Sequence, residues 1–301
     1  MTRRTRIGWL LLILLALAAV QLLRSGAIVI PEAWKPWVPL RIADPPNLLT
    51  GWKLMRASND AAMCQAVLAQ SGFRYTPVDD RETDPGCGFN NAVRITRTSA
   101  AVEPFTLSCR AALSLAMWER HVLQPEAQLW LGSTVSRIEH FGSYACRNVY
   151  GRENASRSRH ATADAFDIAG FVLEDGRRVR VVRDWRHKGA QGYSMPRNES
   201  ADTRASSSPE NGGATVGEHS VLGAVRRALG FDTEGNRRRG AEDASAEDTV
   251  EAFVEGAAEA GFLHAVHRGA CRYFDAVLGP AYNAAHADHF HFDRGGFRAC
   301  R

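Results

Sequence analysis

The stretch Ser158-Arg159-His160-Ala161-Thr162-Ala163-Asp164-Ala165-Phe166-Asp167 places a histidine and an aspartate seven positions apart, where a short apolar run begins. The run, Phe166–Leu173, is followed by Asp175-Gly176. Because this dipeptide is a strong hairpin signal, we expect a strand that turns back into a second strand over 178–182. Zinc binds imidazole nitrogen and carboxylate oxygen, and catalytic zinc sites use three protein ligands. The stretch therefore offers two of the three ligands.

A second histidine cluster lies near the end of the chain, where Asp288-His289-Phe290-His291 falls in a predicted strand over 286–293. Side chains alternate along a strand, so His289 and His291 should share one face, with Asp288 on the other unless a bulge turns it. Either motif alone is weak evidence for a metal site, since a lone His-x-His pair is more often structural or exposed. Together they predict that a histidine, a carboxylate and a second histidine on neighbouring strands bind one metal ion.

Helices and short strands fill the rest of the predicted domain. Apolar residues at helical spacing predict helices, and short apolar runs between polar turns predict strands. The predicted helices cover 60–71, 109–122 and 249–278, and the further predicted strands cover 93–95, 105–107, 132–140 and 144–149. Gly279-Pro280 is expected to end the last helix, which Gly261 could kink or divide. This mixture predicts an α+β fold.

The amino-terminal residues carry a targeting signal. Three arginines precede an apolar run over 7–23, a pattern typical of a signal peptide or a signal anchor. An apolar helix of about 17 residues is just long enough to span a bilayer, and its basic flank should stay in the cytoplasm. Residues 1–29 are therefore predicted to form a cytoplasmic basic start and a single-pass anchor in the inner membrane. Cleaved secretion is the alternative, although no convincing cleavage site precedes Arg24.

Two segments have compositions that disfavour a packed core. Residues 30–47 contain five prolines and predict an extended tether from the membrane, with the folded domain covering 48–301. Residues 188–247 are rich in small polar and charged residues. Such a segment can bury too little apolar surface to offset the conformational entropy that it would lose on folding. It therefore predicts a disordered insertion within the domain.

Charge and cysteine content narrow the function classes. With 37 basic and 33 acidic residues, the net charge of +4 is too balanced to predict a nucleic-acid partner. None of the six cysteines is spaced as Cys-x-x-Cys, so a zinc ribbon is disfavoured and disulfides outside the cytoplasm are expected. We expect some of these bridges to tie the 60–110 region to the later part of the domain.

The motifs also resemble those of known families. The spacing Ser158-x-His160-x-x-Ala163-x-Ala165-x-Asp167 resembles the first zinc motif of the D-alanyl-D-alanine carboxypeptidase and L-alanyl-D-glutamate endopeptidase (LAS-type) superfamily, with Ala163 where glycine is usual. The stretch over 288–291 resembles its second motif. Together with Gly142-Ser143-Tyr144-Ala145-Cys146-Arg147 and the segment 278–291, these motifs are still more similar to the bacterial extensin-like carboxy-terminal domain.

The resemblance implies a fold and a metal. The implied fold is a small, mostly antiparallel sheet flanked by helices, like that of the LAS-type metallopeptidases. The implied cofactor is one Zn²⁺, held by His160, Asp167 and His291.

The resemblance also implies catalytic roles. Asp288 or His289 would be the general base that takes a proton from the attacking water. Arg147 would bind the oxyanion or a carboxylate of the substrate, since a guanidinium suits either. Ser158 would orient a ligand and not act as a nucleophile.

Two functions stay open on these grounds. The first is a zinc peptidase that acts on peptidoglycan stem peptides, as a DD-carboxypeptidase or an endopeptidase, on the periplasmic side of the inner membrane. The second is a non-catalytic wall-binding or scaffolding module that keeps the fold and the metal site without turnover. A metal-independent hydrolase has little support, because no Ser/His/Asp or Cys/His set stands out.

Overall fold

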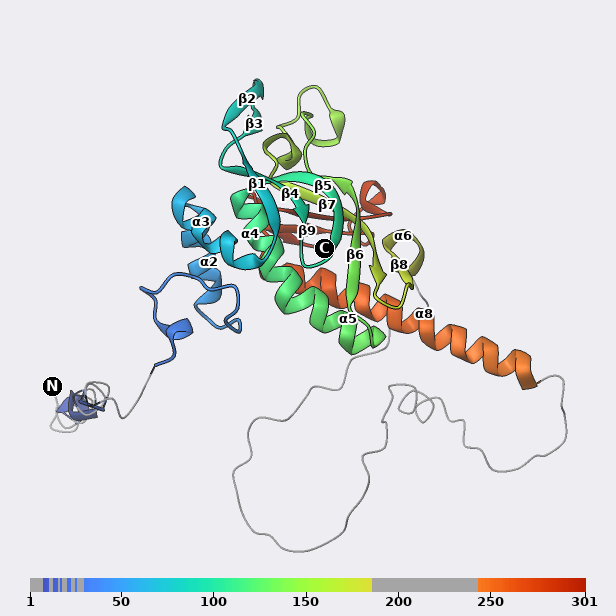
Figure 1. Cartoon of the computed structure of the whole chain (residues 1–301), viewed down its shortest axis with the longest axis horizontal. Helices are drawn as coiled ribbons and strands as arrows, with labels where there is room; N and C mark the ends of the chain where they lie inside the picture. The colour runs from blue at the N-terminus through green and yellow to red at the C-terminus, as the bar shows by residue number, and fades with distance from the viewer. Residues whose placement is uncertain are drawn as a thin grey trace, which may run out of the picture.

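A computed structural model describes residues 30–185 and 243–301 and a few positions between 8 and 25, with side chains in the second range from residue 256 onward (Figure 1). Most of the predicted basic start and anchor, 1–29, and nearly all of the predicted insertion, 188–247, lie outside the described residues. The last five positions of that insertion, 243–247, belong to helix α8. Within the described residues, no helix is both long and apolar enough to cross a membrane.

One large mixed sheet forms the centre of the fold (Figure 1). Its strands lie in the order β1-β4-β5-β6-β7-β10-β9-β11, β8 pairs with β7, and β2 and β3 form a separate two-stranded sheet. Among the described strands, only β5–β6 and β9–β11 pair in parallel. The strands are β1 (Arg74–Val78), β2 (Arg81–Asp84), β3 (Cys87–Phe89), β4 (Ala92–Arg97), β5 (Ala101–Ser108), β6 (Val135–Gly142), β7 (Ala165–Leu173), β8 (Arg178–Arg180), β9 (Ala276–Leu278), β10 (Phe290–Asp293) and β11 (Ala299–Cys300). The predicted α+β class and mostly antiparallel pairing are confirmed, but the expectation of a small sheet is wrong, since the described residues form nine strands in one sheet.

A bulge in strand β7 changes which of its side chains face the core. Glu139 of β6 pairs with Gly170, and the next residue, His140, pairs with Ile168, so Ala169 is the extra residue of a bulge. An extra residue reverses which side chains face the core, because the side-chain period of a strand is two. Core side chains therefore have even numbers before the bulge and odd numbers after it, as in Ile168 and Phe171.

Helices cover one face of this sheet (Figure 1). Helix α4 continues through a π-helical turn, Glu119–Leu123, into α5, and the long helix α8 packs against α5. The rings of Trp118 in α4 and Phe262 in α8 lie 5.3 Å from Phe292 and Phe171 of the sheet. The helices are α2 (Thr50–Ser58), α3 (Ala61–Leu68), α4 (Cys109–Trp118), α5 (Gln124–Leu131), α6 (Val181–Asp184) and α8 (Asp243–Ala270). Burial of these rings fixes the helices on the face opposite the predicted metal ligands.

Gly261 does not divide helix α8, which is continuous through this position. A methyl group built on Gly261 would lie 2.2 Å from the ring of Trp130 in α5. The glycine is therefore explained by the close approach of two helices and not by a kink.

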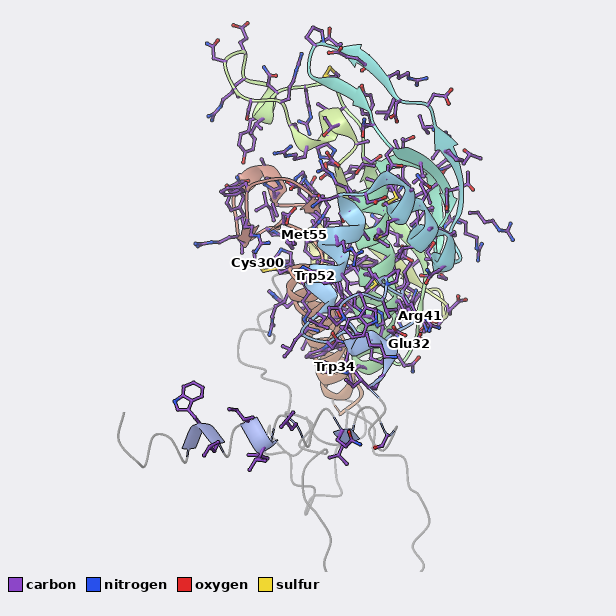
Figure 2. The ribbon with its side chains drawn as sticks, turned by 90° about the vertical axis from the view of Figure 1, so that its left-hand side faces the viewer. Glu32, Trp34, Arg41, Trp52, Met55 and Cys300 are labelled. Atoms are coloured by element: carbon purple, nitrogen blue, oxygen red, sulfur yellow. A yellow bond between two sulfur atoms is a disulfide. The ribbon has the colours of Figure 1, made fainter. Side chains whose placement is uncertain are left out.

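The segment 30–47 packs against the domain over part of its length, which an extended tether would not do. Leu40 and Ile42 are buried in the core. The Lys53 ammonium, itself buried, donates to the carbonyl oxygens of Glu32 and Ala33 at 3.3 and 3.0 Å. These contacts hold the segment beside α2, while Trp34, Trp52 and Met55 remain exposed nearby (Figure 2).

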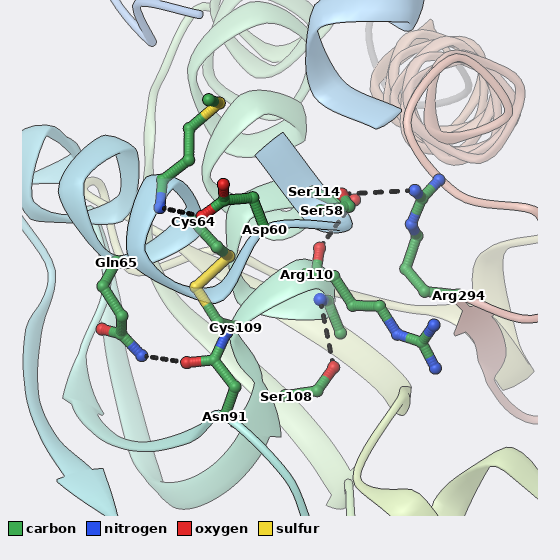
Figure 3. Close-up of a disulfide and its surroundings, with 12 residues drawn as sticks. Ser58, Asp60, Cys64, Gln65, Asn91, Ser108, Cys109, Arg110, Ser114 and Arg294 are labelled. Carbon is green, nitrogen blue, oxygen red and sulfur yellow. Dashed lines mark hydrogen bonds between the residues drawn. A yellow bond between two sulfur atoms is a disulfide. The ribbon is translucent and has the colours of Figure 1, made fainter. Parts of the chain in front are cut away.

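Three disulfides link all six cysteines: Cys64–Cys109, Cys87–Cys146 and Cys271–Cys300. The first ties α3 to the start of α4, beside the hydrogen bond from Gln65 to Asn91 (Figure 3). The second joins β3 to the loop after β6, so the expectation of a bridge between the 60–110 region and later residues holds for this pair. The other two bridges join cysteines that are closer in the sequence, 45 and 29 positions apart compared with 59.

Three predicted elements differ from the structure. Residues 144–149 form a loop and not a strand, because they pair irregularly with 156–160. The helix predicted to reach Leu278 ends at Ala270, and strand β9 precedes Gly279-Pro280. Strand β8 stops at Arg180, where α6 begins. The other predicted helices and strands are found, with shifted ends.

Candidate metal centre

Three side chains from distant parts of the sequence meet at one point. His160 Nε2 lies 3.2 Å from His291 Nδ1 and 3.1 Å from Asp167 Oδ2, and His291 Nδ1 lies 2.8 Å from Asp167 Oδ1. A tetrahedral ion with bonds of about 2.0–2.1 Å holds its ligand atoms about 3.3 Å apart. The three predicted ligands therefore need shifts of only about 0.5 Å or less to surround a zinc ion.

Strand pairing places two of these side chains together. His291 of β10 lies directly opposite Asp167 of β7 in the antiparallel register. Opposite residues project to the same face of a sheet. Phe290 and Phe292, on either side of His291, are fully buried on the helix-covered face, so His291 and Asp167 project from the other face.

A short 3-10 helix, Arg159–Thr162, places His160. The Ser158 hydroxyl accepts a hydrogen bond from the His160 amide at 3.3 Å and caps this helix. The helix is followed by Ala163, whose φ of 54° lies in the left-handed region. A glycine would adopt this conformation without strain, whereas a residue with a Cβ costs about 1–2 kcal/mol there, and this fits the glycine of the motif that the stretch resembles.

Each histidine is held by its second ring nitrogen. His160 Nδ1 lies 3.1 Å from the Ser143 carbonyl oxygen, and His291 Nε2 lies 3.1 Å from Asp293 Oδ2. A carbonyl or carboxylate accepts a hydrogen bond from these nitrogens, so His160 Nε2 and His291 Nδ1 are the nitrogens that a cation would bind once it has displaced their proton. Such outer contacts are typical of metal-binding histidines.

The charges of the cluster are strongly coupled. Burial alone would raise the pKa of Asp167, but the hydrogen bonds from His160 and His291 outweigh burial and lower it well below its usual value. Burial likewise opposes a charged His291, yet Asp167 and Asp293 together raise the pKa of His291 to about 9. Without a cation, the cluster therefore holds a proton that a metal ion would displace.

The two predicted general-base residues occupy different positions. His289 Nε2 lies 3.7 Å from Asp167 Oδ1, beside the cluster. The Asp288 side chain is 53% exposed and bonds His289 Nδ1 at 2.8 Å. His289 therefore adjoins the ligands directly, and Asp288 reaches them only through His289.

Arg147 lies on the loop that follows β6. The backbone of this loop pairs with the segment before His160, as in the 3.0 Å bond from the Ser158 amide to the Arg147 carbonyl. The adjacent Cys146 is bridged to Cys87. Both constraints bring Arg147 to the wall of the same cavity as the three predicted ligands.

The cavity has a volume of about 620 Å³. His286 is buried in its wall, bonded to Asn283, and burial together with the nearby His291 and His289 lowers the pKa of His286 to about 4. The lining residues are Arg147, Val149, Tyr150, Ser156, Arg157, Ser158, Arg159, His160, Asp167, Ala276, Leu278, Tyr282, Ala285, His286, His289, His291, Asp293 and Phe297. All six predicted site residues except Asp288 therefore line one cavity.

A second group of metal-type side chains does not offer a comparable site. Asp84, Cys87 and Cys146 lie close together, but the two cysteines form a disulfide. Their sulfurs are not thiolates, and the thiolate is the form that binds a metal.

Sequence reasoning missed two partners of the cluster. Asp293 had a usable signal, because it follows His291 by two positions in a predicted strand and so shares its face. The Ser143 carbonyl had none, since a backbone oxygen leaves no trace in residue type. Both partners select which nitrogen of a histidine is free.

Comparison with known families supports one assignment. The model of the family described as extensin-like protein C-terminus matches residues 62–203 and 232–301, which is more than two thirds of the chain. Neither the curated proteins nor the solved structures contain a significant match. The matched residues include every predicted ligand and the Arg147 loop, and the chain belongs to the extensin-like protein C-terminus family.

Proposed function

We propose that the chain is a zinc-dependent peptidase that cleaves peptidoglycan peptides. The observation that carries this proposal is the triangle of His160 Nε2, Asp167 and His291 Nδ1, with edges of 2.8–3.2 Å. Structural zinc sites are closed by four protein ligands, whereas catalytic sites have three. Among the described residues, no fourth histidine, cysteine or acid completes the group.

The residues around the triangle have the chemistry that hydrolysis requires. A bound zinc ion would supply a Lewis acid and make water a nucleophile near neutral pH. His289 is the proposed general base, because its Nε2 faces the cluster while its Nδ1 bonds Asp288. Asp288 is proposed to hold the imidazole in the tautomer that leaves Nε2 free to accept a proton.

Arg147 is the proposed stabiliser of negative charge on the substrate. A guanidinium carries a permanent charge and several N–H donors, which suit the oxygen that becomes anionic during attack on a carbonyl. The disulfide at Cys146 and the backbone pairing with Ser158 keep its loop in place. This arrangement supports hydrolysis more than simple retention of a wall polymer.

Peptidoglycan is the proposed substrate because of the two zinc motifs. Their spacing is that of the LAS-type peptidases, and the basic and apolar amino terminus favours export to the periplasmic side of the inner membrane. The three disulfides fit an oxidising compartment. No nucleic-acid partner is proposed.

Incubation of the zinc-loaded full-length chain with purified muropeptides tests this proposal. Mass spectrometry should detect peptide-bond hydrolysis that is lost after chelation and restored by zinc. If every muropeptide stays intact while the chain still sediments with sacculi, the wall-binding module replaces the peptidase as the better account.

A further inference from the structure

Two arginines of the cavity wall have no acidic partner among the residues that the structure describes. Arg157, a third arginine in the same wall, bonds Asp84 at 3.1 Å and the Pro85 carbonyl at 2.7 Å. By contrast, no carboxylate in the described ranges pairs with the guanidinium of Arg147 or Arg159, and both side chains are exposed. The cavity therefore presents two charged groups that are free to bind an anion.

Arg159 occupies a defined position beside the predicted ligands. It directly precedes His160 and begins the 3-10 helix that carries this histidine. A methyl group built on Gly295 would lie 2.4 Å from Arg159 Nε and 3.0 Å from its Cζ. The guanidinium thus lies against the loop that follows β10, and a side chain at position 295 would displace it from this place.

The acids of the cavity are bonded to histidines and not to this arginine. Asp167 bonds His160 and His291, and Asp293 bonds His291. The positive charge must therefore be balanced by solvent or by a ligand. A carboxylate is the matching group, since its two oxygens fit the parallel N–H donors of a guanidinium.

We infer that Arg159 binds the terminal carboxylate of the substrate, so that the site removes the last residue of a peptide and acts as a carboxypeptidase. The inference rests on the proposed peptidase function and assigns a different role to each of the two arginines. Arg159 would bind the carboxylate, and Arg147 would face the carbonyl under attack. In the reaction, water breaks the last C–N bond: its hydroxyl goes to the acyl carbon and its remaining proton to the leaving amine.

One stem pentapeptide in three forms tests the inference. The forms are the free acid, the carboxy-terminal amide, and the free acid with its side-chain carboxyl amidated. Binding to the metal-free full-length chain is measured by calorimetry, where no turnover occurs. We expect the free acid to bind roughly 10- to 100-fold more tightly than the terminal amide, as for a charged hydrogen-bonded pair. Amidation of the side chain should change little. Equal binding of acid and terminal amide, or a loss only on side-chain amidation, would overturn the inference.

Variants test whether the preference for the free acid over the terminal amide depends on Arg159. Arg159→Gln should bind acid and terminal amide alike, while Arg178→Gln, an exposed arginine near Glu139 on the sheet, should keep the preference. Gly295→Ala should reduce the preference severalfold without removing a charge. The matched change Gly296→Ala should not, because a methyl group there meets nothing within 4 Å. An Arg159→Gln protein that is folded and keeps the acid preference would contradict the role of Arg159.

Turnover of the zinc-loaded chain separates this inference from the proposed function. Cleavage of the free acid but not of the terminal amide, with the selectivity lost in Arg159→Gln, supports both. If no form is cleaved but the binding preference still depends on Arg159, the peptidase proposal fails and carboxylate binding stands. Equal cleavage of acid and amide would leave a peptidase without this specificity.

Discussion

His291 and Asp167 lie directly opposite each other on strands β10 and β7, with Nδ1 of the histidine 2.8 Å from Oδ1 of the aspartate. These positions are 124 residues apart in the sequence. Strand pairing, and not local sequence, therefore closes the triangle with His160. Because both strands belong to the central sheet, a rigid scaffold holds the proposed ligands.

Asp293 should control metal affinity without binding the metal. Its carboxylate bonds Nε2 of His291 at 3.1 Å and so directs Nδ1 toward the cluster. We expect Asp293→Asn to weaken zinc binding about 10- to 100-fold, the usual effect of removing such an outer partner. Competition with a chromogenic chelator measures this. Asp175→Asn, which affects an exposed aspartate bonded to Arg177, is the matched control, and equal zinc affinity in both variants would rule out the role of Asp293.

His289 and Asp288 should differ in their effect on turnover. His289 faces the cluster, whereas Asp288 acts through His289, so His289→Ala should lower kcat more than Asp288→Ala. Loss of a general base typically costs about 10²- to 10⁴-fold, and loss of its orienting partner should cost less.

Both variants should still bind one zinc, because neither residue belongs to the triangle. Muropeptide hydrolysis and metal analysis on the same preparations check the two expectations. A larger loss in Asp288→Ala than in His289→Ala would assign the general base to Asp288 instead.

The bridge between Cys87 and Cys146 should affect catalysis as well as stability. Its removal in a Cys87→Ser, Cys146→Ser variant should lower the free energy of unfolding by about 2–4 kcal/mol. Because Arg147 follows Cys146 directly, kcat should also fall, with zinc binding retained. The matched variant lacks Cys271–Cys300, which is remote in sequence from Arg147, and should lose stability without a comparable loss in kcat per folded molecule. Urea unfolding and the kinetics of muropeptide hydrolysis, measured on both variants, test these two expectations.

Glu119 should make stability depend on pH. Burial raises the pKa of Glu119 to about 7, since desolvation outweighs the hydrogen bonds from Ser99 and Thr98. The folded state then binds a proton that the unfolded chain releases at about pH 4.5. The contribution of Glu119 to the free energy of unfolding is therefore fully present below pH 4.5, falls as the pH rises toward 7, and is lost above it, a change of about 3 kcal/mol.

Glu119→Gln should remove this dependence, because the amide resembles the protonated acid and keeps an oxygen for the Ser99 amide. Urea unfolding at pH 4.5 and pH 8 gives the difference between variant and wild type. A wild-type protein whose pH dependence matches that of the variant would show that Glu119 titrates normally.

Local patterns in the sequence predicted the elements that carry the site. The hairpin at Asp175-Gly176, the helix that starts near Cys109 and the strand around His291 follow from turn chemistry and periodicity, and the structure contains all three. The two motifs that resemble zinc-binding motifs also identified three side chains that meet at one point. Periodicity and ligand chemistry are local properties, so sequence can reveal them.

Features that depend on tertiary structure were harder to predict from the sequence. The bulge at Ala169 reverses which side chains of β7 face the core. Gly170 beside it is a residue type that suggests a bulge, but it does not specify the new register. Residues 144–149 resemble a strand but are held as a loop by the Cys87–Cys146 bridge and by pairing with 156–160. The number of strands in the sheet depends on long-range pairing, which a pattern of apolar residues does not specify.

Zinc K-edge X-ray absorption on the purified full-length chain tests the proposed metal centre most directly. The account predicts one zinc per chain, bound by two imidazole nitrogens and one carboxylate oxygen at about 2.0–2.2 Å. It also predicts that His160→Ala, Asp167→Ala and His291→Ala each remove stoichiometric zinc. A chain without stoichiometric zinc, or one whose zinc environment is unchanged in all three variants, would contradict it.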